Sequence, residues 1–210
     1  MKKLNKDLVE IADYYSNKLN EFGATPNGVD WNGEDSQFVR FQQLLKVVSY
    51  EPNHSFSVND LGCGYAAVLD YLTENFDNYS YLGFDVSSDM VTAALSRVSG
   101  IKNARIKCSS TIDEVADYGI ASGVFNVKLD NSYDDWLGYI KQSLQNLHQT
   151  SNKGFSFNCL TSYSDKDKMK DYLYYADPLE MFDFCKKTFS RNVALLHDYD
   201  LYEFTILVTK

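Results

Sequence analysis

The sequence predicts an α/β fold, in which a mostly parallel sheet is flanked by helices and ends in an antiparallel hairpin. Strand-like apolar runs alternate with helical patterns between residues 56 and 187, the pattern expected of a parallel sheet with helical crossovers. The last two runs, 192–197 and 201–209, are separated by only three residues. Because so short a link cannot contain a crossover helix, these two runs must pair antiparallel. A chain of 210 residues is long enough to bury one core around such a sheet.

The first 50 residues are predicted to form a helical segment that covers or closes over the sheet. Residues 5–21 show a helical spacing of apolar residues that ends near Gly23, and residues 36–48 show a second one. Asp35 or Ser36 is expected to cap the second helix. The link between them, 23–33, is rich in turn residues but contains one large aromatic side chain, Trp31. We therefore divide the chain into a cap or lid, residues 1–50, and a compact domain, residues 51–210.

Strands and helices then follow in turn. Strands are predicted at 56–61, 79–85, 104–108, 118–122 and 154–160, and helices at 66–75, 87–98, 133–149 and 179–187. Ser87 or Ser88 is expected to cap the second of these helices, and Pro178 fits the first position of the last one. The segment 159–178 shows no clear element, and a connection of that length is usually functional or contains short helices.

The composition narrows the class of protein. There are 29 acidic and 20 basic residues, a net charge of −9, which argues against a nucleic-acid substrate because phosphate binding needs a basic surface. The four cysteines are scattered without a CxxC pair, so we expect no metal site and no disulfide, and reduced thiols in the cytoplasm. Neither a signal-peptide core nor an apolar run of about 20 residues is present, so we expect no membrane association.

One turn between a strand and a helix has the character of a ligand site. The run Asp60-Leu-Gly62-Cys-Gly64 follows the first strand, where glycines allow a ligand to approach the backbone and a helix N-terminus presents free N–H groups. Gly62, Gly64 and Ala67 also satisfy the GxGxx(G/A) dinucleotide pattern. Asp60 suits a cationic ligand with a free amino group. Asp85, which ends the second strand, suits the two hydroxyls of a ribose, as NAD would also require.

These motifs together resemble those of class I S-adenosylmethionine-dependent methyltransferases. The resemblance rests on Asp60–Gly64, on Tyr81-Leu-Gly-Phe-Asp85-Val-Ser-Ser-Asp-Met90 and on Asp117–Gly123, and it covers roughly residues 55–210. It implies a Rossmann-like sheet of seven strands with a C-terminal antiparallel hairpin, and S-adenosylmethionine as the cofactor. The cofactor-binding residues that it implies are Asp60, Gly62, Cys63, Gly64, Asp85, Val86, Met90, Ser109, Ser110, Ser122 and Gly123. Two departures are that Ala66 replaces the third glycine and that Ser109 or Ser110 stands where an acid often contacts the adenine.

The methyl acceptor is expected to lie where further strands end at the same edge of the sheet. The candidate catalytic residues are His197, whose imidazole suits a base near neutral pH, Tyr175 and Asn126. The candidate substrate-binding residues are Tyr14, Trp31, Arg40, Phe125, Tyr163, Tyr174 and Tyr199. Tyr15 is a further candidate in the lid. For His197, Tyr174 and Tyr175 a purely structural role is the more common one, and Arg40 could hold a carboxylate or phosphate.

A dedicated base is optional, since the cofactor supplies the activation. The acidic charge and the 16 tyrosines favour a small polar metabolite or a sugar-derived intermediate as the O- or N-acceptor. The alternatives are a protein or nucleic-acid methyltransferase of the same fold and a non-catalytic module that retains the cofactor pocket. A nicotinamide enzyme is a further alternative. Ser122-Gly-Val-Phe-Asn126 lacks the Asn/Asp-Pro-Pro-aromatic pattern of enzymes that methylate amino groups of flipped bases.

Overall fold

The computed structural model describes residues 2–49 and 54–210. The elements are α1 (Lys2–Phe22), η1 (Pro26–Val29), α2 (Glu34–Leu45), β1 (Phe56–Leu61), α3 (Val68–Asn75), β2 (Tyr79–Asp85), α4 (Ser88–Arg97), β3 (Ala104–Cys108), β4 (Ala116–Ala121), α5 (Tyr133–Gln149), β5 (Ser151–Thr161), β6 (Tyr175–Ala176), α6 (Pro178–Thr188), β7 (Asn192–Leu196) and β8 (Glu203–Thr209). The proposed boundary between cap and domain, at residues 50 and 51, lies outside the described residues.

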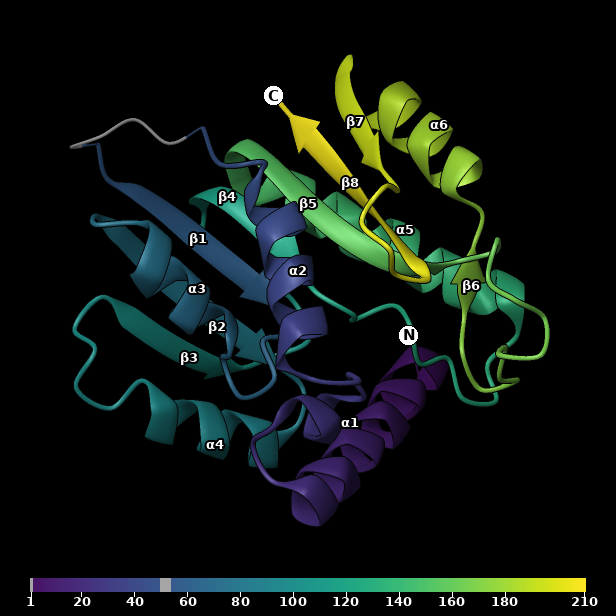
Figure 1. Cartoon of the computed structure of the whole chain (residues 1–210), viewed down its shortest axis with the longest axis horizontal. Coiled ribbons are helices and arrows are strands. Elements are labelled where there is room, and N and C mark those ends of the chain that lie inside the picture. Colours follow the sequence, from purple (N-terminus) through teal and green to yellow (C-terminus); the bar gives the residue numbers. More distant parts are fainter. Residues whose placement is uncertain (1, 50–53) are drawn as a thin grey trace.

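The strands form one sheet in the order β3-β2-β1-β4-β5-β8-β7, and β6 pairs with the end of β5. β1 to β5 are parallel, while β8 runs antiparallel to both β5 and β7. The arrow of β8 accordingly points opposite to the others (Figure 1). The expected mostly parallel sheet with a C-terminal hairpin is confirmed. The sequence did not predict β6, a two-residue strand that lies within the segment 159–178 and is parallel to β5.

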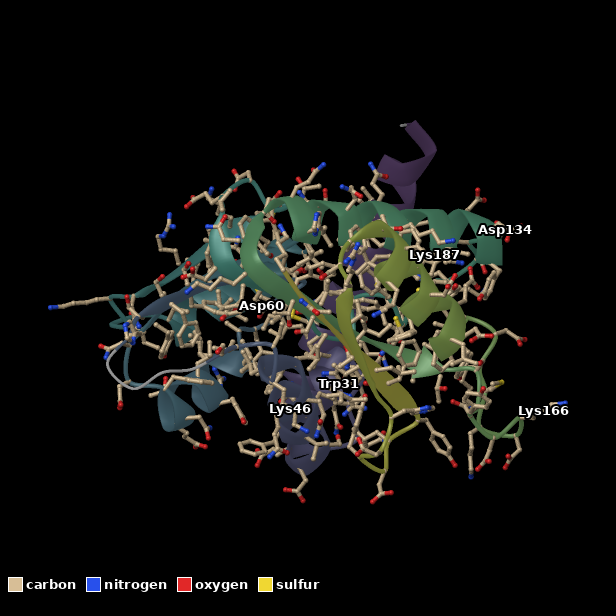
Figure 2. The ribbon with its side chains drawn as sticks, turned by 90° about the horizontal axis from the view of Figure 1, so that it is seen from above. Trp31, Lys46, Asp60, Asp134, Lys166 and Lys187 are labelled. Atoms are coloured by element: carbon tan, nitrogen blue, oxygen red, sulfur yellow. The ribbon has the colours of Figure 1, made fainter. Side chains whose placement is uncertain are left out.

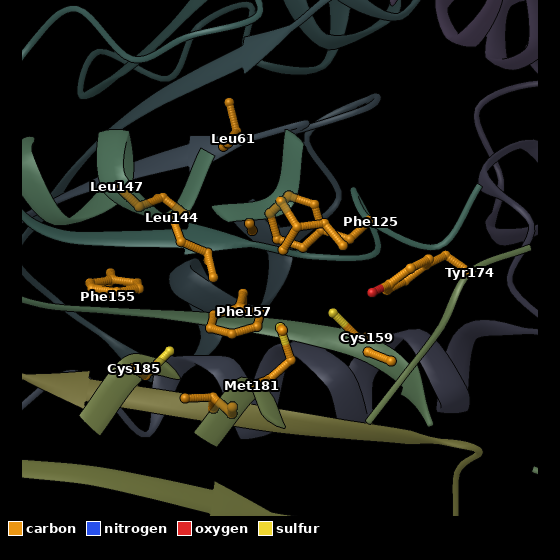
Figure 3. Packing of buried hydrophobic residues seen from close by; sticks show 14 of the residues in the cluster. Leu61, Phe125, Leu144, Leu147, Phe155, Phe157, Cys159, Tyr174, Met181 and Cys185 are labelled. Carbon is orange, nitrogen blue, oxygen red and sulfur yellow. The ribbon is translucent and has the colours of Figure 1, made fainter. Parts of the chain in front are cut away.

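Two hydrophobic clusters cover the two faces of the sheet. One is formed by α2, α3 and α4 over β1 and β4, with Leu45, Leu69 and Ala94 among its members. The other lies under α5 and α6 and contains Phe155 and Phe157 of β5; Figure 3 shows this second cluster at close range. In both, alternate residues of buried strands contribute to opposite faces, as the two-residue repeat of a strand requires.

Helix α1 lies beyond the carboxyl ends of the parallel strands. In Figure 1 the arrows of β1, β2 and β3 point toward α1 and the short helix η1, and α1 packs against η1 and α4. The N-terminal segment therefore covers the edge of the sheet at which parallel strands present ligand sites.

The helix caps agree with the sequence in two of three cases. The Ser87 hydroxyl accepts a hydrogen bond from Met90 N at the start of α4, and Asp177 caps α6, where Pro178 is the first residue. At α2 the prediction was wrong: Gly33 holds the N-cap position and makes no side-chain cap. In the described part of the chain, none of the helices combines the length and the apolar character needed to cross a bilayer.

Candidate functional site

A pocket at the carboxyl ends of β1, β2 and β4 is lined by both the glycine turn and the N-terminal helix; we call it the central pocket. It encloses about 670 Å³, its open mouth included, within the range of small-molecule sites. Nine of the residues predicted to bind the cofactor line it: Gly62, Gly64, Asp85, Val86, Met90, Ser109, Ser110, Ser122 and Gly123.

The glycine turn forms the floor of this pocket. Gly62 and Gly64 adopt positive φ angles of 68° and 53°, which glycine adopts without steric cost. A Cβ at Gly62 would also lie 2.4 Å from a methyl carbon of Val124. The amides of Gly62 and Cys63 donate to Phe84 O, at 2.7 and 3.0 Å. The turn is therefore bonded to the end of β2, next to Asp85.

Asp85 is held in place by the backbone. Its Oδ2 accepts from Gly64 N at 2.8 Å and its Oδ1 from Ser87 N at 2.9 Å. Because a carboxylate oxygen can accept two hydrogen bonds, each oxygen keeps capacity for one more donor. The side chain is 8% exposed, and this burial raises the pKa of the carboxyl group, although the backbone donors oppose the increase. The geometry fits a ligand with two adjacent hydroxyls.

Asp60 lies beneath the turn rather than in the central pocket. With Cys63 it lines an adjoining cavity that shares Gly62, Gly64 and Ser122 with the central pocket, and in Figure 2 it lies among the central side chains. Asp60 Oδ2 accepts from the Tyr81 hydroxyl at 2.8 Å, but Oδ1 is buried and has no hydrogen-bond partner among the described residues. Burial raises the pKa of Asp60 to about 7. A cationic amine at this position would supply the missing partner.

The roof of the central pocket comes from α1. Leu8, Ile11 and Tyr15 line the pocket from this helix. The helix is fixed by a hydrogen bond from the Tyr14 hydroxyl to Asp30 and by an ion pair between Lys18 and Asp30 at 2.8 Å. The Tyr14 side chain therefore holds the roof and does not line the pocket. Its neighbour Tyr15 lines the pocket in its place.

A second pocket, which we call the adjacent pocket, meets the central pocket at Tyr15, Val29, Trp31 and Gly123. Trp31 lines both pockets and the Asp60 cavity as well. A Cβ at Gly123 would lie 2.3 Å from a ring carbon of Trp31, so glycine is required for this close approach. Of the predicted acceptor residues, Trp31, Arg40 and Asn126 line the adjacent pocket.

Arg40 is part of a buried network that the sequence pattern does not predict. Its Nε and Nη2 donate to the two carboxylate oxygens of Glu203, at 3.0 and 2.9 Å, and its guanidinium stacks on Trp31 with the carbon 3.8 Å from the ring centre. Asn158 Nδ2 donates to Glu203 at 2.7 Å, and Asn158 Oδ1 accepts from Gly123 N at 2.7 Å. Trp31, which stacks on Arg40, also packs against Gly123, so the contacts form a closed ring. Arg40 therefore already has a carboxylate partner within the chain.

The structure does not bring the other predicted acceptor and catalytic residues into either pocket. His197 is exposed and its ring contacts Tyr163 and Phe204. Phe125 and Tyr174 are buried in the core under α5 (Figure 3). The last three are Tyr163, Tyr175 and Tyr199. Tyr163 is 66% exposed. The Tyr175 hydroxyl accepts a hydrogen bond from Lys170 N, and the Tyr199 hydroxyl lies 3.0 Å from Thr205 Oγ1.

Several pocket residues were absent from the sequence predictions. In the central pocket they include Val29, Trp136 and Tyr139, and in the adjacent pocket they include Asp30, Tyr172, Asp200 and Glu203. Trp136 and Tyr139 are three residues apart and lie on one face of α5, as residues that pack a helix onto a sheet do. Glu203 is the first residue of β8. In sequence, none of the three differs from an ordinary structural residue. Asp200 is the exception, because it lies in the turn between the last two predicted strands. The sequence alone could place that turn at the end of the sheet where the pockets lie.

Comparison with known proteins identifies a similar sequence. A protein of Mycobacterium tuberculosis (strain ATCC 25618 / H37Rv) named "Putative methyltransferase Rv1506c" is 56% identical over 155 residues, which cover 74% of this chain and 93% of that protein. No family model matches the chain.

Solved structures share the fold at low identity. The DhpI–SAH complex superimposes with a TM-score of 0.65 at 14% identity and covers 97% of both chains. Magnesium protoporphyrin IX methyltransferase (ChlM) from Synechocystis PCC 6803, with bound SAH, gives a TM-score of 0.67 at 12% identity over 97% of this chain and 99% of that one.

Proposed function

The chain belongs to the class I S-adenosylmethionine-dependent methyltransferases, and from that premise we propose that it methylates a small polar metabolite or a sugar-derived intermediate on oxygen or nitrogen. The observation that carries the proposal is the junction of the two pockets at Tyr15, Val29, Trp31 and Gly123. A donor in one pocket and an acceptor in the other would meet there.

The residues of the central pocket fit S-adenosylmethionine. Asp85 offers two oxygens to the ribose hydroxyls, and the unpartnered Oδ1 of Asp60 lies beneath the turn where the amino group of the methionine part would complete its hydrogen bonding. Met90, Ser109 and Ser110 line the part of the pocket that would hold the adenine. When bound, the cofactor supplies an electrophilic methyl group on a sulfonium.

On the acceptor side, the chain's own residues would position the nucleophile and exclude water. The roof formed by α1 and Trp31 would keep water from the junction. The Tyr15 hydroxyl has no hydrogen-bond partner among the described residues, and burial together with Asp30 and Asp85 raises its pKa above the ordinary value. At neutral pH it would act as a hydrogen-bond donor to the acceptor. Asn126 lines the adjacent pocket, and we propose that it orients the acceptor there.

The size of the acceptor follows from the shape of this site. The adjacent pocket encloses about 1160 Å³, open solvent included, and is lined by residues of both the N-terminal segment and the C-terminal hairpin, dimensions that fit a small molecule. The net charge of −9 argues against a nucleic acid. Cys63, Cys108, Cys159 and Cys185 are free thiols, in keeping with the cytoplasmic location that we propose.

Two linked measurements test the proposal. Thermal-shift titration with S-adenosylmethionine, its demethylated product S-adenosylhomocysteine and NAD should show stabilisation by the two sulfur ligands and none by NAD. Tritiated methyl groups should then pass into the small-molecule part of a cell extract. Labelling of protein or nucleic acid in its place would assign the acceptor to a macromolecule, and binding without any transfer would identify a non-catalytic module.

A further inference from the structure

The charged side chains of the adjacent pocket restrict what the acceptor can be; this inference rests on the proposed function. Four side chains that carry a charge at neutral pH line the pocket: Asp30, Arg40, Asp200 and Glu203. Arg40 is the one cation among the residues that line it. Whether the pocket can hold an anion therefore depends on whether the charge of Arg40 is available.

Arg40 is neutralised inside the protein. Its ion pair with Glu203 is bidentate, and the two side chains are 8% and 1% exposed. A third donor, Nη1, reaches Ser36 O at 2.7 Å. Because Glu203 lines the same pocket, an anionic ligand near Arg40 would meet the carboxylate as well. A phosphate or carboxylate on the acceptor would thus lose its hydration without gaining a counter-charge, which is unfavourable.

The two remaining acids differ from each other. Asp30 is paired with Lys18, which lies outside the pocket, and with the Tyr14 hydroxyl. Asp200 is exposed and has neither an ion pair nor a hydrogen bond among the described residues. The uncompensated charge of the pocket is therefore negative and is located at its rim.

The other polar groups of the pocket suit hydroxyls and amines. Tyr15 and Tyr172 contribute phenolic hydroxyls. Asn126 uses its Oδ1 to accept from Leu160 N at 3.0 Å, and its amide nitrogen has no partner among the described residues. Trp31 and Leu201 add apolar surface beside them. A ring with hydroxyls on its edge and apolar faces matches this combination.

We propose that the acceptor of this enzyme carries no phosphate and no carboxylate, and that it is a neutral hydroxyl-rich molecule or one that bears an amine. Its oxygen or nitrogen gains the methyl carbon as the carbon–sulfur bond breaks. The bonding pair stays on sulfur, and the proton of the nucleophile is released to solvent.

The test separates acceptors by charge before the reaction. A metabolite extract freed of macromolecules is divided on ion exchangers at neutral pH into anionic, neutral and cationic fractions. Each fraction is incubated with the full chain and tritiated-methyl S-adenosylmethionine. Label should enter the neutral or the cationic fraction. Label that enters the anionic fraction overturns the inference but leaves the proposed function intact, whereas no label in any fraction, with cofactor binding confirmed, overturns the proposed function.

The variant Asp200→Asn then distinguishes the two permitted classes. Asp200 has a φ of 56°, a conformation that Asn also tolerates, so the variant removes the charge and keeps the shape. For an amine-bearing acceptor the half-saturating concentration should rise about two- to fivefold, the scale of an exposed ion pair, and for a neutral one it should stay unchanged. A lower half-saturating concentration would show that the acceptor is anionic and would overturn the inference. Asp198→Asn, an exposed change outside both pockets, is the matched control.

Discussion

The floor of the central pocket and the acceptor side of the molecule are built in different ways. The floor comes from short runs: Gly62–Gly64 follow β1 directly, and Asp85 is the last residue of β2. The adjacent pocket brings together Trp31, Arg40 and Glu203, which are far apart in the sequence. The floor of the central pocket therefore depends on local turns, whereas the adjacent pocket depends on how the N-terminal segment packs on the C-terminal hairpin. Four predictions, from the largest expected effect to the smallest, test this difference.

The largest effect should follow the loss of one partner of the buried ion pair. Glu203→Leu leaves the Arg40 guanidinium buried without a counter-charge and removes the acceptor for Asn158. We expect the free energy of unfolding to fall by about 3–5 kcal/mol, measured by urea denaturation.

The matched control is the double variant Arg40→Met/Glu203→Leu, which removes both charges and should recover most of the loss. Asp183→Ala breaks an exposed ion pair with Lys187 and should cost less than about 1 kcal/mol. If Glu203→Leu lowered the free energy of unfolding no more than Asp183→Ala does, the buried network would not stabilise the packing of the N-terminal segment on the hairpin.

The second-largest effect is expected for ligand binding at the floor of the central pocket. Asp85→Ala should weaken the binding of S-adenosylhomocysteine by about 1–3 kcal/mol, the scale of lost hydrogen bonds to a charged group, measured by titration calorimetry. Asp89 is an exposed acid in the first turn of α4 that does not line the central pocket, so Asp89→Ala should leave the dissociation constant within about twofold. Equal effects in the two variants would show that the ribose is not held at Asp85.

The same contrast explains how far the sequence could predict this protein. The alternation of strands and helices and the short link between β7 and β8 specified the sheet, because periodicity and chain connectivity are local properties. Of the nine predicted residues that line the central pocket, eight lie at or just after the end of a strand, and Met90 lies near the start of α4. Short local motifs were therefore enough to name them. Glu203 and Asn158 could not be recognised, because a polar residue inside a strand gives no sign of a partner 163 or 45 positions away. Tyr14 and Tyr15 are adjacent on a helix, and only the packing of α1 decides which one faces the pocket.

A smaller effect should appear in the pH dependence of Asp60. Its pKa of about 7 in the folded protein lies above the ordinary 3.8, so between about pH 4 and 7 the folded chain holds a proton that the unfolded chain has lost. The contribution of Asp60 to stability therefore decreases as pH rises through this interval. A cationic amine bound beside Asp60 favours the carboxylate, so the affinity for S-adenosylhomocysteine should rise about tenfold from pH 6 to pH 8.

Asp60→Asn provides the control for that measurement. The amide keeps the shape and a hydrogen-bond partner for Tyr81 but does not titrate, so the affinity should become weaker and nearly independent of pH. A wild-type affinity that does not change over this interval would place the amino group of the ligand away from Asp60. The floor would then consist of the turn and Asp85 alone.

The smallest effect is expected at His197, the residue that by chemistry alone is the most attractive base. Its ring is exposed, contacts Tyr163 and Phe204, and lines neither pocket, so His197→Ala should change the methyl-transfer rate less than about twofold and the free energy of unfolding by about 0.5 kcal/mol or less. Asn126→Ala, a change in a residue that lines the adjacent pocket, should lower the rate further. If His197→Ala lowered the rate more than Asn126→Ala, the turn after β7 would have to reach the junction during the reaction. The acceptor side would then depend on movement of the hairpin as well as on its packing.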